Sequence, residues 1–208
     1  MFFGRTNGCN QLNGELNEKG VAGHNNAKYL DQKKFWVLRE CSEALGVSIY
    51  LHITDSHWSR KIYEQHPELR LWSWGVETAT HALRIIASGV FDAFSKATLI
   101  LGHLGESLPY LLGRINQRTS TVSKSEKLKK PLSHYIKENI VITTSSRYNP
   151  EALVCAVHAL GADRILFAAD YPYLTPKEAV GLIENTPISD WEKEQIYHLN
   201  AERWLKLQ

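Results

Sequence analysis

The sequence predicts an α/β protein whose core is a parallel sheet covered by helices. Short runs of strand-forming aliphatic residues alternate with amphipathic helical runs, and each aliphatic run ends on a polar residue. This alternation is typical of parallel strands joined by right-handed crossovers. Neither GxGxxG nor GxxxxGK[ST] follows a predicted strand, which argues against a nucleotide-binding doubly wound sheet. A (β/α)-barrel with polar residues at its strand ends fits the pattern better.

Length and composition suit one globular domain, or one and a half, and argue against some classes of partner. The chain has 208 residues, of which 43% are hydrophobic and 22% charged. A net charge of +2 is too small to favour nucleic acid or a membrane surface as a partner. No apolar run reaches the ~18 residues of a spanning helix, and the first residues lack a signal-peptide core. The cysteines form no CxxC pattern, so we expect free thiols and a cytoplasmic protein.

The first half of the chain begins with an irregular segment and continues with alternating elements. Residues 1–17 are rich in asparagine and glycine and are expected to be irregular, which leaves 18–208 as the predicted barrel domain. Asp31 is the expected N-cap of a helix that Gly46 ends. The expected elements are a weak strand at 19–23, a helix at 31–45, a strand at 47–51, an irregular stretch at 53–74 and a helix at 76–90.

The second half repeats the strand–helix pattern and closes with two helices. Pro150 stands in the first turn of its helix, where its missing N–H costs nothing. A lysine-rich stretch at 119–130 is expected to be a solvated loop. The expected elements are strands at 97–102, 139–145 and 164–169, and helices at 108–118, 132–137, 149–160, 176–184 and 190–207.

Polar residues follow the predicted strands, where the strands of a barrel share one rim. His52, His103 and Asp170 each end a strand, and Thr143 and Thr144 make a hydroxyl-rich end of a fourth. Because active sites of barrels lie at the carboxyl ends of the strands, we expect these groups to form a site. Imidazole and carboxylate are ligands that suit zinc or manganese. The alternative is that both histidines are structural and that Asp170 caps the turn that follows it.

Two further residues near His103 have open interpretations. Glu106 is either a carboxylate stabilised at the start of a helix or a hydrogen-bond partner that sets the tautomer of His103. Arg114 lies on the same predicted helix, near the face of Glu106. It either binds a substrate carboxylate in bidentate fashion or is solvated, as helix arginines more often are.

Four blocks of sequence resemble the amidohydrolase-related decarboxylases. They are IYLH at 49–52, ETATHALRIIASGVFD at 77–92, LILGHLGESLPY at 99–110 with RINQR at 114–118, and GADRILFAADYP at 161–172. Within that family the chain looks most like the γ-resorcylate and 2,3-dihydroxybenzoate decarboxylases, relatives of aminocarboxymuconate-semialdehyde decarboxylase. The resemblance extends from about residue 20 to the C-terminus.

The resemblance implies a metal-dependent (β/α)8 TIM barrel that decarboxylates a small, dihydroxybenzoate-like aromatic acid, and it suggests a homodimer. It implies that His52 and Asp170 bind a divalent metal, zinc or manganese. It also implies that His103 is the catalytic histidine with Glu106 as its partner. Arg114 matches an arginine that lies near the substrate.

The chain departs from the family pattern in two respects. Isoleucine and threonine follow His52, where the family continues with proline and arginine. The family's first strand carries two more ligands as an ExH or HxH pair, and no such strand is recognisable here. Only about five βα units are found, so the expected fold is an N-terminally truncated barrel. Three functions stay open: a decarboxylase, which truncation can leave active or inactive, a metal-dependent hydrolase of the same superfamily, and a non-catalytic truncated paralogue.

Overall fold

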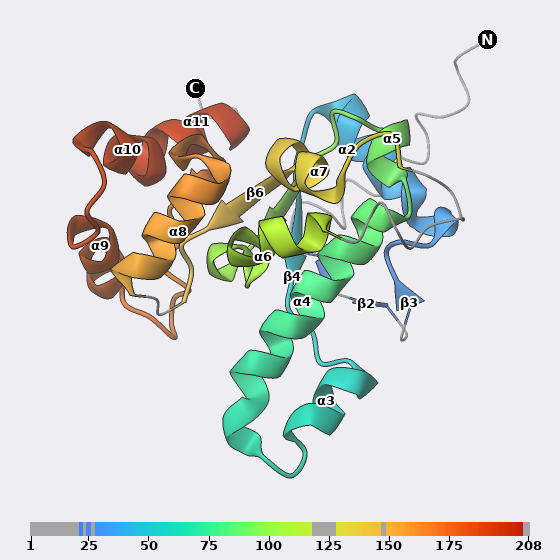
Figure 1. Ribbon diagram of the computed structural model, residues 1–208, viewed down its shortest axis with the longest axis horizontal. Helices are drawn as coiled ribbons and strands as arrows, with labels where there is room; N and C mark the ends of the chain where they lie inside the picture. The colour runs from blue at the N-terminus through green and yellow to red at the C-terminus, as the bar shows by residue number, and fades with distance from the viewer. Residues whose placement is uncertain (1–20, 23, 26–27, 118–127, 147–148, 206–208) are drawn as a thin grey trace. The chain divides into compact units, whose positions relative to one another are not determined.

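The computed structural model describes residues 21–22, 24–25, 28–117, 128–146 and 149–205 (Figure 1). The segment 1–17 and most of the lysine-rich stretch lie outside these residues. The chain divides into two compact units, Met1–Thr98 and Leu99–Gln208, and each is described by itself. Both units combine parallel strands with helices, as the sequence predicts.

The first unit contains a parallel strand pair and a short hairpin. β1 (Val21–Ala22) pairs with β4 (Ile49–His52), which confirms the strands expected at 19–23 and 47–51. The hairpin of β2 (His24–Asn25) and β3 (Lys28–Tyr29) was not predicted, because its sequence is polar. The helical elements are η1 (Lys33–Phe35), α2 (Trp36–Leu45), α3 (His57–Tyr63), η2 (Pro67–Leu69), α4 (Arg70–Ala87) and α5 (Val90–Ala93).

The two ends of the first predicted helix have different outcomes. Gly46 ends α2 as expected, with a φ of 62° and an N–H that donates to the Glu43 carbonyl at 3.2 Å. Asp31 as its N-cap is wrong, since α2 begins at Trp36 after a 3-10 turn. The Asp31 carboxylate instead pairs with the guanidinium of Arg84 on α4 at 2.7 Å.

The stretch 53–74, expected to be irregular, is largely helical. Ser56 caps α3 in a reciprocal capping box, in which its side chain accepts from the Ser59 N–H and the Ser59 hydroxyl accepts from the Ser56 N–H. α4 begins at Arg70, six residues before the expected start at 76. Leu71 and Trp72 in its first turns are 73% and 64% exposed, so apolar residues there do not follow the buried stripe of the helix.

The cysteines and the hydropathy of the helices concern two further expectations from the sequence. Cys41 is disulfide-bonded, so the free-thiol expectation is wrong for Cys41, whereas Cys155 is free. Among the residues with a described position, no helix is both long and apolar enough to cross a membrane.

The second unit is built on three parallel strands with β6 in the middle. β5 (Leu99–Leu101) pairs with β6 (Ile140–Thr143), and β6 pairs with β7 (Ile165–Leu166). All residues of these strands are buried, which explains their continuous aliphatic sequences. The helical elements are η3 (His103–Gly105), α6 (Leu108–Asn116), α7 (Leu132–Asn139), α8 (Pro150–Leu160), η4 (Ala162–Arg164), α9 (Pro176–Glu184), α10 (Asp190–Glu194), the π-helix η5 (Gln195–Leu199) and α11 (Asn200–Leu205).

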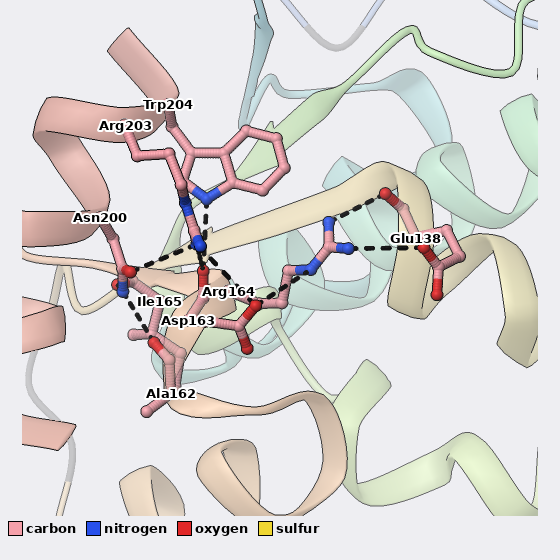
Figure 2. A network of polar contacts seen from close by, with 8 residues as sticks. All are labelled: Glu138, Ala162, Asp163, Arg164, Ile165, Asn200, Arg203 and Trp204. Carbon is pink, nitrogen blue, oxygen red and sulfur yellow. Dashed lines mark hydrogen bonds and ion pairs between the residues drawn. The ribbon is translucent and has the colours of Figure 1, made fainter. Parts of the chain in front are cut away.

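The C-terminal helices cover the outer edge of β7. The buried Asn200 amide donates to the carbonyls of Ile165 and Ala162, both at 2.8 Å (Figure 2). The Phe167 N–H donates to the Ile196 carbonyl in the π-helix at 3.0 Å. These bonds satisfy edge groups of β7 that would otherwise be an open template for another strand. The other residues of the network in Figure 2 are Glu138, Asp163, Arg164, Arg203 and Trp204.

Candidate active site

His103 follows β5 in a turn whose backbone is strained. His103, Leu104 and Glu106 have φ values of 54°, 51° and 57°. Within the described chain, the other non-glycine residues with positive φ are Ser146 and Asp170, so all five follow strands of the second unit. Each such conformation costs about 1 to 3 kcal/mol and persists only where the surroundings impose it. Strain of this kind is concentrated at functional sites.

Gly105 allows this turn to pack closely against the middle strand. Its φ is 71°, and a Cβ at this position would lie 2.7 Å from Cγ2 of Ile142 on β6. Any other residue would therefore meet both a backbone penalty and a steric clash. The close contact with β6 therefore fixes the position of the turn that carries His103.

His103 and Glu106 form a short hydrogen bond within the turn. Nδ1 of His103 lies 2.7 Å from Oε1 of Glu106, and their side chains are 14% and 7% exposed. This geometry selects the second interpretation of Glu106, as the partner of His103. A carboxylate accepts, so Nδ1 donates, and Nε2 is the ring nitrogen left to exchange a proton.

The pKa of His103 reflects competing influences. Burial alone would lower the pKa of the imidazole. The hydrogen bond and charge of Glu106, with the charge of Asp170 in addition, outweigh burial and raise the pKa of His103 above its ordinary value. His103 and Asp170 both lie in the second unit, after β5 and β7 respectively.

Asp170 lies in the turn after β7 and has a φ of 59°. The turn is closed by main-chain bonds, since the Asp170 carbonyl accepts from the N–H groups of Tyr173 at 2.9 Å and Leu174 at 3.2 Å. The alternative of a capping role for the Asp170 carboxylate is thus not needed to explain the turn. The side chain is half-buried and available for chemistry at the strand end.

Hydroxyl side chains at the end of β6 contact both neighbouring strand ends. Ser145 Oγ accepts from the His103 N–H at 2.9 Å and lies 2.9 Å from Thr143 Oγ1. Thr144 Oγ1 lies 2.9 Å from the nitrogen and 3.0 Å from the carbonyl oxygen of Ala168. The sequence shows a hydroxyl-rich strand end, but the partners lie 42 and 24 residues away, so their pairing was missed.

His52 ends β4 in the first unit and is exposed. Its Nδ1 lies 3.0 Å from the Ile53 carbonyl, to which it donates. In the neutral ring Nε2 then keeps a free lone pair, the arrangement that a metal-binding histidine needs. His52 belongs to a different unit from His103 and Asp170, so its relation to them stays a prediction.

The donors in the described residues do not make a complete metal site. No group of three His, Cys, Asp or Glu side chains able to hold a metal occurs in the part of the chain that the structure describes. Catalytic zinc sites usually have three protein ligands and an open position. His52 and Asp170 provide two suitable donors, fewer than the three ligands of such a site. We therefore assign no reaction step to a metal.

Arg114 lies in the last turn of α6 and is exposed. In the described structure it makes no hydrogen bond or ion pair with His103, Glu106 or Asp170. The structure therefore does not join the predicted substrate arginine to the pair, and its role stays a prediction.

The strand order and the polar strand ends of these units define an α/β protein of the amidohydrolase barrel type. The model of the amidohydrolase family matches residues 18–207, and the chain belongs to this family. The fold class and the family resemblance predicted from the sequence are confirmed.

Curated relatives with sequence similarity include γ-resorcylate decarboxylases. The enzyme from Polaromonas sp. is 38% identical over 184 residues, which cover 86% of this chain and 56% of the relative. The enzyme from Rhodococcus jostii is 32% identical over 201 residues, which cover 94% of this chain and 61% of the relative. The chain thus spans little more than half the length of these relatives.

Solved structures of decarboxylases are similar to this chain. The dihydroxybenzoic acid decarboxylase of Polaromonas sp., with bound manganese and the inhibitor 2-nitroresorcinol, has a TM-score of 0.79 and 38% identity, covering 86% of this chain and 55% of that one. The 5-carboxyvanillate decarboxylase of Sphingomonas paucimobilis has a TM-score of 0.87 and 29% identity, covering 99% of this chain and 64% of that one.

Proposed function

We propose that this chain carries the proton-transfer part of a decarboxylase site for a small hydroxylated aromatic acid of the dihydroxybenzoate class. The observation that supports this most directly is the His103–Glu106 hydrogen bond beside the charge of Asp170 at the strand ends. The similar proteins include a γ-resorcylate decarboxylase and a 2,6-dihydroxybenzoate decarboxylase, and this supports the substrate class.

In this proposal His103 is the acid and Glu106 positions it. Protonated His103 donates Nδ1–H to Glu106 and presents Nε2–H to the ring carbon that bears the carboxylate. The proton adds to that carbon, the bond to the carboxylate breaks, and its electron pair restores the aromatic ring as carbon dioxide leaves. Glu106 stabilises the imidazolium and fixes the ring orientation, so the proton donor needs no rearrangement at the moment of reaction.

The remaining predicted residues have binding roles in the proposal. Arg114, which is exposed in the last turn of α6, binds the substrate carboxylate. His52 and Asp170 contribute donors to a divalent metal, with manganese the ion bound in a solved relative. The metal, when bound, supplies positive charge for substrate oxygens, and the proton transfer above is assigned to the chain's own residues alone.

The test is release of carbon dioxide from 2,6- and 2,3-dihydroxybenzoate by the purified chain with and without added Mn²⁺. We expect turnover by the wild type and a loss of at least about 100-fold in His103→Asn, because general acid catalysis contributes about that factor. Asparagine tolerates the positive φ at this position, so the variant keeps the turn.

The matched control is His134→Asn, which alters an exposed histidine on α7 outside the site. It is expected to keep full turnover. Equal activity in His103→Asn and the wild type, or no carbon dioxide from a manganese-loaded wild type, refutes the proposal. Hydrolysis of a lactone or amide without carbon dioxide release would identify the chain as a hydrolase instead.

A further inference from the structure

Two consecutive residues at the end of β6, Thr144 and Ser145, each contact one of the strand ends that carry the candidate acid and the candidate metal ligand. Ser145 Oγ accepts from the main-chain N–H of His103 at 2.9 Å. Thr144 Oγ1 bonds both main-chain groups of Ala168, two residues before Asp170. Thr144 is fully buried and Ser145 is 3% exposed, so neither hydroxyl competes with water for these bonds.

We propose that Thr144 and Ser145 are positioning residues, which together set the spacing between His103 and Asp170. β6 pairs with β5 on one side and β7 on the other, so its end is adjacent to both strand exits. The inference rests on the proposed function for the roles of His103 and Asp170. Its geometric part, that each hydroxyl fixes its own strand exit, stands apart from those roles.

The Thr144 hydroxyl continues strand pairing beyond the end of β7. The last main-chain bond between the strands runs from the Thr144 N–H to the Leu166 carbonyl at 3.0 Å. Past this point Thr144 Oγ1 accepts from the Ala168 N–H and donates to the Ala168 carbonyl. A hydroxyl has one proton and two lone pairs, so both bonds form at once. β7 is thereby held to β6 until two residues before Asp170.

The Ser145 hydroxyl fixes the main chain of His103, whereas Glu106 fixes its ring. A histidine at a φ of 54° keeps this conformation only when several contacts impose it. Ser145 supplies one such contact at the N–H, and its hydroxyl is oriented in turn by Thr143 at 2.9 Å. The position of Nε2 therefore depends on β6 through Ser145 as well as on the neighbouring carboxylate.

The test separates the hydroxyl groups from the shape of the side chains. Thr144→Val removes the hydroxyl at nearly constant volume, whereas Thr144→Ser retains it, and Ser145→Ala removes the second hydroxyl. The matched control is Thr186→Val, because Thr186 is 2% exposed in the same unit and its hydroxyl donates to the Leu182 carbonyl at 2.6 Å, away from the strand ends.

Hydrogen–deuterium exchange, which needs no substrate or metal, measures whether each hydroxyl fixes its own strand exit. Thr144→Val is expected to speed exchange in residues 167–174 by roughly five- to tenfold, the factor that one hydrogen bond contributes, and to leave 102–106 unchanged. Ser145→Ala is expected to do the reverse. Thr144→Ser and the Thr186→Val control are expected to match the wild type in both segments.

Turnover of dihydroxybenzoate measures whether the two hydroxyls position His103 and Asp170 for the proposed reaction. Thr144→Val and Ser145→Ala are expected to lower kcat about 10- to 100-fold at unchanged KM, because displacement of a reacting group by about 1 Å costs up to that factor. Thr144→Ser is expected to restore kcat, and Thr186→Val to keep it despite a comparable loss in Tm.

A uniform rise in exchange over the whole second unit in Thr144→Val, or an equal fall of kcat in Thr186→Val, overturns the positioning role. If Thr144→Val does not fold, Ser145→Ala tests the same inference from the other strand exit. A wild type that shows no turnover with manganese refutes the proposed function, and the exchange measurements still decide whether each hydroxyl fixes its own exit.

Discussion

Replacement of Gly105 by alanine should strongly destabilise the second unit, for two reasons that add. An alanine at the φ of 71° pays about 1 to 2 kcal/mol for the left-handed backbone. Its Cβ would lie 2.7 Å from Cγ2 of Ile142, an overpacking that costs about 1 to 3 kcal/mol more. We therefore expect the free energy of unfolding to fall by about 2 to 5 kcal/mol.

The chain offers a matched control for this substitution. An added Cβ at Gly113 on α6 meets nothing within 4 Å, so Gly113→Ala should raise stability by about 0.5 to 1 kcal/mol through helix propensity alone. Urea unfolding followed by both circular dichroism and tryptophan fluorescence measures the two variants. Coincident transitions are required before either difference is read as a free energy.

A double-mutant cycle isolates the steric part. Ile142→Ala removes Cγ2, so Gly105→Ala should cost less by about 1 to 3 kcal/mol in an Ile142→Ala background than in the wild type. Gly105→Ala within about 0.5 kcal/mol of the wild type would refute the whole account. A large loss with no coupling to Ile142 would refute the close approach to β6 and leave only the backbone penalty.

Three further predictions concern residues outside the strand ends. Glu202 and Glu194 flank His198 at 2.8 and 2.9 Å and raise the pKa of His198. The stabilisation from these contacts is complete below the unfolded pKa of about 6.5 and is lost as pH rises through the higher folded pKa. Tm should therefore fall over that pH range, and a His198→Gln variant with the same pH dependence would contradict this. Asn200→Leu should cost about 2 to 4 kcal/mol in urea unfolding, since two buried carbonyls lose their donor, and a loss below 1 kcal/mol would argue against the cover over β7. Burial lowers the pKa of Arg39 to about 10, and its terminal nitrogens make no hydrogen bond within the described residues. Arg39→Met should therefore raise stability by about 1 to 4 kcal/mol. A lower Tm in this variant would reveal a counter-charge outside that part of the chain.

Elements with strong local signals were predicted well from the sequence. The helix expected at 176–184 is α9, because Thr175 and Glu178 form a capping box around Pro176 in the first turn. The buried strands were found as aliphatic runs, with ends displaced by one to three residues. In each case the interactions that define the element lie within a few residues of one another.

The elements that were missed depend on weaker or more distant signals. The capping box of α3 uses Ser59 in place of the usual glutamate or glutamine, so its start was not recognised. The helix expected at 190–207 contains the π-helix η5, whose Ile196 carbonyl accepts from the N–H of Phe167, directly after β7. Nothing in the local sequence specifies that partner.

In the candidate site, too, the sequence indicated the local contacts and missed the distant ones. The contact between His103 and Glu106 joins residues three positions apart, and local sequence therefore offered it as one of two interpretations. The contacts of Thr144 and Ser145 with neighbouring strand exits follow from the order β5–β6–β7, which no local pattern states. Prediction of such contacts requires the register of each strand pair.

The cover over β7 has a consequence for synthesis of the chain. Asn200 follows its acceptor Ile165 by 35 residues, so β7 leaves the ribosome well before the group that satisfies its outer edge. At a translation rate of about 5 to 20 residues per second, that edge stays unpaired for about two to seven seconds. During this interval the nascent aliphatic strand can pair with other chains. Conditions that slow translation of residues 166–200 should therefore favour aggregation of the nascent protein over folding.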